Sequence, residues 1–223
     1  MPPTTTDPTA LHTAPARGAW SRCVAAIYDP FLALGEHRGM RERRRRLLRR
    51  ARGRVLEIGA GTGLNLEHYP DELDELVLSE PVVPMARRLG SRLRRSRVQG
   101  SVVHAPAEAL PVDTGSVDTV VSTMVLCTVP DPEAVLDEIR RVLRPDGRLL
   151  FCEHVRSESK RLARWQERLA GPWEWFADGC RCDQDTLGLI EDAMRIEHVE
   201  REEWRGMPGL LRPLVVGEAR VDT

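Results

Sequence analysis

The stretch Val55-Leu56-Glu57-Ile58-Gly59-Ala60-Gly61-Thr62-Gly63 decides the fold class of this chain. It begins as an apolar strand and ends in a turn whose alternate residues lack a β-carbon, so the backbone there can approach a ligand closely. A dinucleotide-binding turn follows the spacing GxGxxG, which would need a glycine at position 64, where this chain has Leu64. The spacing GxGxG therefore makes a nicotinamide or flavin cofactor the weaker interpretation.

An acidic residue supports a ligand site at this turn. Glu80 follows the next predicted strand, Glu75–Ser79, at about the offset where an acid holds ribose hydroxyl groups in nucleotide-binding folds. A helix is predicted to begin after the turn, over Leu64–His68. The alternative is a structural tight turn with a surface glutamate, and the joint presence of strand, turn, helix and acid disfavours it.

The rest of the chain alternates strands with helices. Strands are predicted over residues 54–58, 75–79, 98–104, 117–124 and 148–155, helices over 82–95 and 132–143, and two closing strands over 196–199 and 214–219. Such alternation is typical of an α/β doubly wound, mostly parallel sheet, whose ligands bind above the carboxyl ends of the strands.

The residues before the first strand divide into a tail and a candidate lid. Residues 1–18 are rich in Pro, Thr and Ala and are predicted to be a disordered tail, followed by a single domain over 19–223. A helical segment over Trp20–Leu34 is predicted to break at Pro30. Tyr28 and Asp29 are expected in a mobile lid, because the chain must cross the carboxyl edge of the sheet before the first strand.

An arginine-rich segment precedes the glycine turn. Its arginines are Arg41, Arg43, Arg44, Arg45, Arg46, Arg49, Arg50 and Arg52, and Met40, Leu47, Leu48 and Ala51 recur among them at helical spacing. This pattern predicts a helix packed by an apolar stripe, with the arginines on a solvated face. A patch for nucleic acid or lipid headgroups is the less favoured alternative.

Composition limits the partners and the compartment. Lys and Arg total 33 against 34 Asp and Glu, and the net charge of −1 gives no overall attraction for nucleic acid or anionic lipid. Five cysteines without CxxC spacing argue against disulfides and against a metal site. No apolar run approaches the roughly 18 residues of a membrane span, so we expect a cytoplasmic protein without integral membrane association.

The motifs resemble those of the class I S-adenosylmethionine (SAM)-dependent methyltransferases, whose first motif is acid-x-Gly-x-Gly-x-Gly, as from Glu57 to Gly63. Three later stretches resemble later motifs of that family, in order: Ala107-Glu108-Ala109-Leu110-Pro111, Asp118 with Val120-Val121-Ser122-Thr123, and Val142-Leu143-Arg144-Pro145-Asp146-Gly147. The resemblance implies SAM as the cofactor and a Rossmann-like seven-stranded sheet with an antiparallel last strand.

The resemblance also implies a donor site. The glycine turn would lie under the methionine part of SAM, Glu80 would hold the ribose, and Ala107 with Glu108 would flank the adenine. Many relatives have an aspartate where this chain has Pro106, so backbone and packing are expected to hold the adenine. The expected cofactor-binding residues are Glu57, Gly59, Gly61, Gly63, Asn65, Glu80, Ala107, Glu108 and Thr123.

Three further stretches narrow the resemblance to the thiol S-methyltransferases and their bacterial relatives: Thr123-Met124-Val125-Leu126-Cys127, Phe151-Cys152-Glu153-His154-Val155, and Phe176-Ala177-Asp178-Gly179-Cys180. Glu153, His154 and Asp178 become the candidate catalytic residues. His154 is either the base that takes a proton from a thiol or a structural residue that fixes the pocket floor.

The acceptor side is expected to be apolar. Tyr28, Trp173 and Phe176 are the candidate substrate-binding residues, and the tryptophans near the last of them form either core or pocket wall. Cys180 and Cys182 are expected to be packing residues, because methyl transfer from SAM needs no covalent enzyme intermediate. The sequence thus predicts methylation of a small-molecule thiol by direct in-line displacement. The alternative is an O-, N- or C-methyltransferase of quinone, phospholipid or natural-product metabolism.

Overall fold

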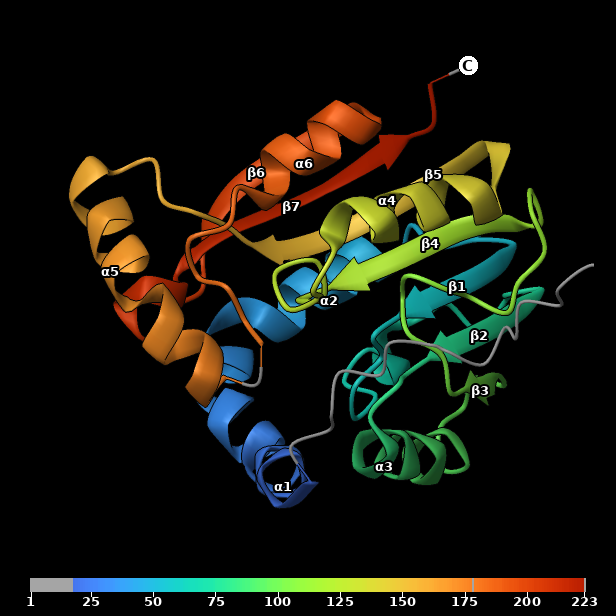
Figure 1. Ribbon diagram of the computed structural model, residues 1–223. Helices are drawn as coiled ribbons and strands as arrows, with labels where there is room; N and C mark the ends of the chain where they lie inside the picture. The colour runs from blue at the N-terminus through green and yellow to red at the C-terminus, as the bar shows by residue number, and fades with distance from the viewer. Residues whose placement is uncertain (1–17, 178, 223) are drawn as a thin grey trace, which may run out of the picture.

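The computed structural model describes residues 18–177 and 179–222. Seven strands form one sheet in the order β3-β2-β1-β4-β5-β7-β6 (Figure 1). Their bounds are β1 Arg54–Ile58, β2 Glu75–Ser79, β3 Ser101–Val103, β4 Val117–Thr123, β5 Leu143–His154, β6 Arg195–Glu203 and β7 Pro213–Arg220. Strands β1 to β5 pair in parallel, and β7 runs antiparallel to both of its neighbours. The predicted fold class and the antiparallel last strand are confirmed.

The register brings the ends of four neighbouring strands to one edge. Glu57 of β1 lies opposite Leu78 of β2 and Val121 of β4, and Thr123 of β4 lies opposite Cys152 of β5. Because parallel strands end at the same edge, Glu57 and the residues after β2, β4 and β5 share one rim of the sheet.

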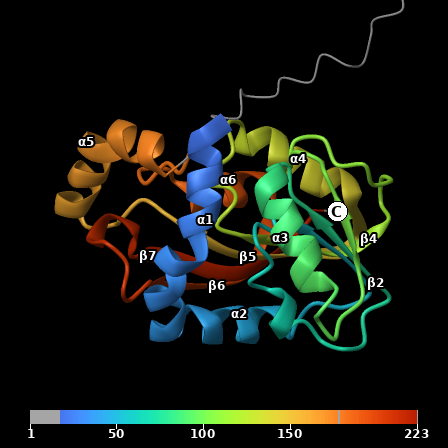
Figure 2. The ribbon, with the colours of Figure 1, turned by 90° about the horizontal axis from the view of Figure 1, so that it is seen from below.

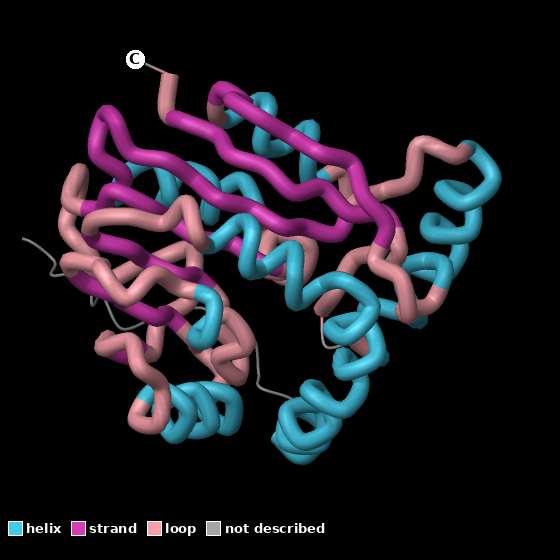
Figure 3. The backbone as a smooth tube through the Cα atoms, turned by 180° about the vertical axis from the view of Figure 1, so that it is seen from behind, coloured by secondary structure: helices cyan, strands magenta, loops and turns pink. Residues whose placement is uncertain are grey.

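Helices cover both faces of the sheet. Helices α4 (Pro132–Val142) and α6 (Thr186–Ala193) pack into one apolar core, while α1 (Gly18–Gly35), α2 (Arg41–Leu48) and α3 (Val83–Leu93) border the other. Seen from below, α1 and α3 lie side by side (Figure 2). Seen from behind, α2 crosses the strands (Figure 3), and α5 (Lys160–Phe176) lies at the end of the molecule beside β6 and β7.

The predicted helix break at Pro30 is wrong. Helix α1 continues through Pro30, which lies on its exposed side, and the chain bends later, at Arg38 and Gly39. Gly39 has φ = +121°, a conformation that glycine adopts without a steric penalty. The bend lies in the π-helical turn η1 (Glu36–Met40), which joins α1 to α2.

Two other elements are shorter than predicted. The helix expected over Leu64–His68 is only a 3₁₀ turn, η2 (Leu66–His68), because Asn65 and Tyr69 turn into the protein to bind Glu57. The third strand, expected over 98–104, keeps only Ser101–Val103. The predicted tail over residues 1–18 lies outside the described residues except for Gly18, which begins α1.

The arginines of α2 pair with carboxylates of this chain. Arg43 and Arg46 both bind Glu202 of β6, and Arg46 also lies 2.9 Å from Glu200. Arg41 binds Glu67 at 2.8 Å. The expectation of a wholly solvated face therefore needs correction, because several of these arginines join α2 to other elements. Among the described residues, every helix is too short or too polar to cross a membrane.

Candidate functional site

The glycine turn leaves open space above its middle residue. Gly59, Gly61 and Gly63 all have positive φ, at 53°, 57° and 87°. A β-carbon added to Gly59 would lie 2.7 Å from Val125, and one added to Gly63 would lie 2.9 Å from Leu66. At Gly61 the nearest atom would be 3.9 Å away. Gly59 and Gly63 are therefore required by packing, whereas Gly61 leaves a cradle that a ligand can enter.

Glu80 supports this turn from the end of β2. Its side chain is buried, with one carboxylate oxygen accepting a hydrogen bond from the Gly61 amide at 2.8 Å and the other from the Val82 amide at 2.7 Å. Burial raises the pKa of Glu80 above its usual value, although both amides oppose the shift. The structure thus brings Glu80 and Gly61 together, as the sequence predicts.

Glu57, at the end of β1, is the centre of a buried polar network. Its carboxylate accepts hydrogen bonds from the Asn65 amide group at 2.8 Å and from the Tyr69 hydroxyl at 2.7 Å. Asn65 also donates to Thr123 at 3.0 Å. Burial raises the pKa of Glu57 to about 7, with both hydrogen bonds opposing the rise. Three of the expected cofactor-binding residues therefore lie in direct contact.

Arg44 completes this network and was missed from the sequence. Its guanidinium is buried, donates to Asn65 at 2.8 Å and to Thr123 at 3.2 Å, and pairs with Glu36 at 3.1 Å. The signal was the position of Arg44, which lies four residues after Met40 and three before Leu47, on the apolar stripe of α2. A charged residue on the inward face of a helix is costly to bury, so such a position points to a function or a buried partner.

The expected adenine segment follows β3. Ala107 is buried in the core, Glu108 is half-buried, and the Ala109 amide donates to the Pro106 carbonyl at 3.2 Å to close a turn. Pro106 has no side-chain acceptor to offer an adenine amino group. Backbone groups of the turn and the neighbouring apolar side chains are the groups available there.

Helix α1 is fastened to the glycine turn. Asp29 accepts a hydrogen bond from the Thr62 hydroxyl at 2.6 Å and pairs with Arg92 of α3 at 2.6 Å. Tyr28 is half-buried, and burial raises its pKa to about 12 even though Arg44 opposes the shift. Tyr28 packs against the apolar core that includes Ala60 and Tyr69, so the segment expected to form a lid lies beside the glycine turn.

Glu153, near the end of β5, is fully buried. Its carboxylate accepts hydrogen bonds from the Ser122 hydroxyl at 2.6 Å and from the Val125 amide at 3.1 Å, and the amides of Leu126 and Cys127 also contribute. Burial raises the pKa of Glu153 to about 7. These contacts hold the loop after β4 against β5.

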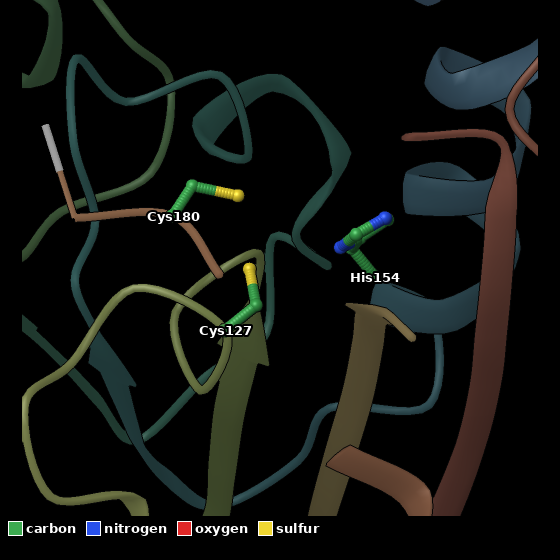
Figure 4. Close-up of side chains that lie close together, drawn as sticks. All are labelled: Cys127, His154 and Cys180. Carbon is green, nitrogen blue, oxygen red and sulfur yellow. The ribbon is translucent and has the colours of Figure 1, made fainter. Parts of the chain in front are cut away.

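His154 faces two cysteines from separate segments. Its Nε2 lies 2.9 Å from the Leu210 carbonyl, and its Nδ1 is buried with no hydrogen-bond partner in the described part of the chain. Burial lowers the pKa of His154. The ligand atoms of Cys127, His154 and Cys180 all lie within 4.8 Å of one another (Figure 4). The contact between the two thiols lowers the pKa of Cys180 and raises that of Cys127.

The aromatic residues of α5 separate into an inner and an outer group. Trp173 is half-buried beside Cys180, and its ring centre lies 5.6 Å from that of Phe176. Trp165, Trp175 and Phe176 are exposed by 49%, 61% and 43%, so Phe176 belongs to the outer group although its ring lies near Trp173. Trp173, one of the residues predicted to line the substrate pocket, therefore lies next to Cys180. Asp178, the third expected catalytic residue, lies outside the described residues.

Comparisons with known proteins agree with this geometry. Residues 56–151 match the family described as methyltransferase domain. The human thiol S-methyltransferase TMT1B is 32% identical over 86% of this chain and 85% of its own length, and human TMT1A is 33% identical over 74% and 69%. A solved SAM-dependent methyltransferase from Thermotoga maritima, described as a possible histamine N-methyltransferase, has 21% identity and a TM-score of 0.65 over 92% of this chain and 99% of its own.

The strand order, the glycine turn and these similarities define a class I methyltransferase that uses SAM as its methyl donor. Within that class, the chain belongs to the family of the thiol S-methyltransferases TMT1A and TMT1B.

Proposed function

We propose that this enzyme methylates the sulfur of a small thiol. The observation that carries the proposal is the similarity to TMT1B, which is 32% identical over 86% of this chain. When bound, SAM supplies an electrophilic methyl group on a positively charged sulfonium. The role of the protein is then to hold a sulfur nucleophile in line with that methyl group.

The donor side of the site is assigned to the residues around the glycine turn. Gly61 lets SAM approach the backbone, and Glu80, whose carboxylate accepts a hydrogen bond from the Gly61 amide, is assigned to the ribose hydroxyls. Glu57, Asn65 and Thr123, with Arg44, form the charged floor beneath the methionine part. Ala107 and Glu108 border the adenine.

The acceptor side is assigned to the residues that face this floor from the loop after β4, β5, α1 and α5. Val125, two residues before Cys127, packs on Gly59, so this loop adjoins the donor turn. Tyr28 and Trp173 supply apolar surface, and Phe176 extends it. An apolar pocket with few polar groups suits a small, fairly apolar thiol and no large charged partner such as nucleic acid.

The residues expected to be catalytic receive different roles. The Glu153 carboxylate already accepts hydrogen bonds from Ser122 and from amides of the loop after β4. We therefore assign Glu153 to positioning this loop, which carries Cys127. His154 Nδ1 has no hydrogen-bond partner among the described residues and lies beside the two cysteines, so we assign His154 to the acceptor side of the site.

A substrate panel tests the proposal. At pH 7 a thiol with a pKa of about 8.5 is about 3% ionised, and a phenol with a pKa of about 10 only about 0.1%. We therefore expect aryl or alkyl thiols to outpace phenols and amines of matched shape by at least about tenfold in SAM-dependent product formation. Samples without enzyme correct for spontaneous methylation. Phenols or amines reacting faster than every thiol would contradict S-methylation and favour the O-, N- or C-methyltransferase alternative.

A further inference from the structure

Cys127, His154 and Cys180 form a cluster that the donor site does not explain. They come from the loop after β4, the end of β5 and the segment after α5, and their side chains turn toward one another (Figure 4). Their ligand atoms all lie within 4.8 Å of one another, and Cys127 and His154 are buried. Two sulfur atoms and one imidazole nitrogen are a donor set that zinc and other thiophilic cations prefer.

The hydrogen bond of His154 determines which ring nitrogen carries the lone pair. A carbonyl can only accept, so the 2.9 Å contact with the Leu210 carbonyl requires that Nε2 carry the hydrogen. Nδ1 of the neutral ring then carries a lone pair, and this atom is buried with no hydrogen-bond partner among the described residues. Histidines that bind metal ions characteristically donate their other ring N–H to a carbonyl or carboxylate in this way.

Backbone contacts hold the two cysteines together. The Arg181 amide donates to the Cys127 carbonyl at 2.7 Å, which ties the segment after α5 to the loop after β4. Gly179, with φ = +111°, allows close packing there, because an added β-carbon would lie 3.0 Å from the Thr128 carbonyl oxygen. The Glu153 carboxylate binds the amides of the same loop from the other side. These backbone contacts between the two segments thus fix the positions of both cysteines.

We infer that Cys127, His154 and Cys180 bind a thiophilic divalent cation such as Zn²⁺, with a fourth coordination position open to the acceptor thiol. In a tetrahedral zinc site with Zn–S of about 2.3 Å and Zn–N of about 2.0 Å, ligand atoms lie about 3.5–3.8 Å apart. The three ligand atoms would need to move at most about 1 Å closer together, from the limit of 4.8 Å, to reach these separations. The absence of CxxC spacing argued against a metal site in the sequence. That argument does not apply to these three ligands, because each of them lies on a different segment of the chain.

This inference rests on the proposed function for the identity of the fourth ligand. Three protein ligands leave one tetrahedral position, as in catalytic zinc sites. The acceptor thiol would lose its proton to water as its sulfur binds the cation. In methyl transfer, the thiolate sulfur forms a bond to the methyl carbon, the bond from that carbon to the SAM sulfonium breaks, and its electron pair stays on the S-adenosylhomocysteine sulfur. The product thioether is neutral and a weaker ligand, so it leaves.

Metal binding is tested without measuring activity. The reduced, metal-free full-length protein is titrated with Zn²⁺ against a chromophoric chelator, and separately with Co²⁺ followed by absorption. We expect one equivalent of zinc per chain, and a cobalt spectrum with thiolate charge-transfer and intense tetrahedral d–d bands. Cys180→Ser, at a half-buried position, should lower zinc affinity by at least about 100-fold. Cys182→Ala, two residues away and outside the cluster, should leave it unchanged.

Each outcome decides a part of the inference. Absence of stoichiometric binding by the reduced wild type, or equal affinity in Cys180→Ser, would overturn the metal site. His154→Gln and Cys127→Ser provide further ligand variants, with circular dichroism to verify folding. Adding a small thiol should shift the cobalt bands, and an unchanged spectrum would refute the open position. Thiol methylation by a protein that binds no zinc would leave the proposed function intact, whereas zinc binding without thiol methylation would refute that function alone.

Discussion

Three acidic residues, Glu57, Glu80 and Glu153, are buried at or just after the ends of β1, β2 and β5. Burial raises the pKa of each, because the charged form loses hydration that its hydrogen bonds only partly replace. A cation bound nearby would favour the ionised forms. SAM carries a positive sulfonium and an amino group, so the donor side is prepared for a ligand of that charge.

Glu57 should make stability depend on pH. In the folded protein its pKa is about 7 instead of 4.5, so the folded state keeps a proton that the unfolded chain has lost between these values. Stability should therefore fall as pH rises from about 4.5 to about 7, by up to about 3 kcal/mol from this residue. In Glu57→Gln, urea unfolding of the SAM-free protein at pH 5 and pH 8 should show a smaller fall.

The matched control for Glu57 is Glu72→Gln, an exposed carboxylate outside the network, which should keep the wild-type pH dependence. If Glu57→Gln lost as much stability as the wild type between pH 5 and pH 8, Glu57 would not be the buried acid responsible.

Glu80 should determine SAM affinity. Removing a carboxylate that makes charge-assisted hydrogen bonds to ribose costs roughly 1.5–3 kcal/mol, which is about ten- to hundredfold in affinity. Glu80→Ala should show this loss in isothermal titration calorimetry with S-adenosylhomocysteine, and Glu80→Gln, which keeps one acceptor oxygen, should lose less. An unchanged affinity in a folded Glu80→Ala protein would refute the ribose assignment.

At the scale of elements, α2 carries its most important charge on its buried side. Arg44 pairs with Glu36 and with the Asn65 side chain, whereas its neighbour Arg45 is exposed and pairs with Glu42 in the same helix. Removing one partner of a buried ion pair costs about 3–5 kcal/mol, because the other charge remains buried. An exposed pair within one turn of a helix contributes far less, because water screens both charges.

Arg44→Met should therefore lower the free energy of unfolding by about 3 kcal/mol or more, and Arg45→Met should change it much less. Chemical denaturation of the two variants gives the comparison directly. Equal effects would mean that Arg44 is solvated in the folded protein and does not support the side chains of Asn65 and Thr123.

Helix α1 should respond to the ligand. Asp29 fastens it to Thr62 of the glycine turn and to Arg92, so a ligand that orders the turn should also stabilise α1. We expect the amides of Gly18–Gly35 to exchange hydrogen more slowly when S-adenosylhomocysteine is bound, and Asp29→Asn to reduce that protection. If exchange in α1 did not change on ligand binding, α1 would have a fixed structural role.

At the scale of the whole molecule, carboxylates of this chain pair with several arginines of the arginine-rich segment. Arg43 and Arg46 of α2 bind Glu202, and Arg50 binds Glu218 of β7, so part of its positive charge is neutralised by the sheet. With a net charge of −1, the protein has little long-range attraction for polyanions.

Gel-shift assays at low salt should therefore show no binding of duplex DNA or RNA by the wild type. The double variant Glu200→Gln/Glu202→Gln frees Arg43 and Arg46 and should increase any weak binding, which added salt should abolish. Tight binding by the wild type would revive the alternative of a nucleic-acid patch.

The sequence alone determined the architecture and the arrangement of the glycine turn with Glu80. The strand bounds of β1 and β2, the helices α3 and α4, and the strand–turn–acid arrangement of Gly59, Gly61 and Glu80 follow from local patterns. Apolar periodicity and glycine spacing act over a few neighbouring residues, and a parallel sheet then brings the strand ends to one edge. Those expectations therefore required no knowledge of distant contacts.

Only the tertiary structure decided what meets at that edge. Arg44 belongs to a run that looks solvated in sequence, and its burial depends on the packing of α2 against β5, β7 and η2, which brings Arg44 to Asn65 and Thr123. Cys127, His154 and Cys180 come together because β4 and β5 are neighbours and the segment after α5 returns across them. Such contacts join residues far apart in the chain, and the local preferences of each segment contain no information about the partner it will meet.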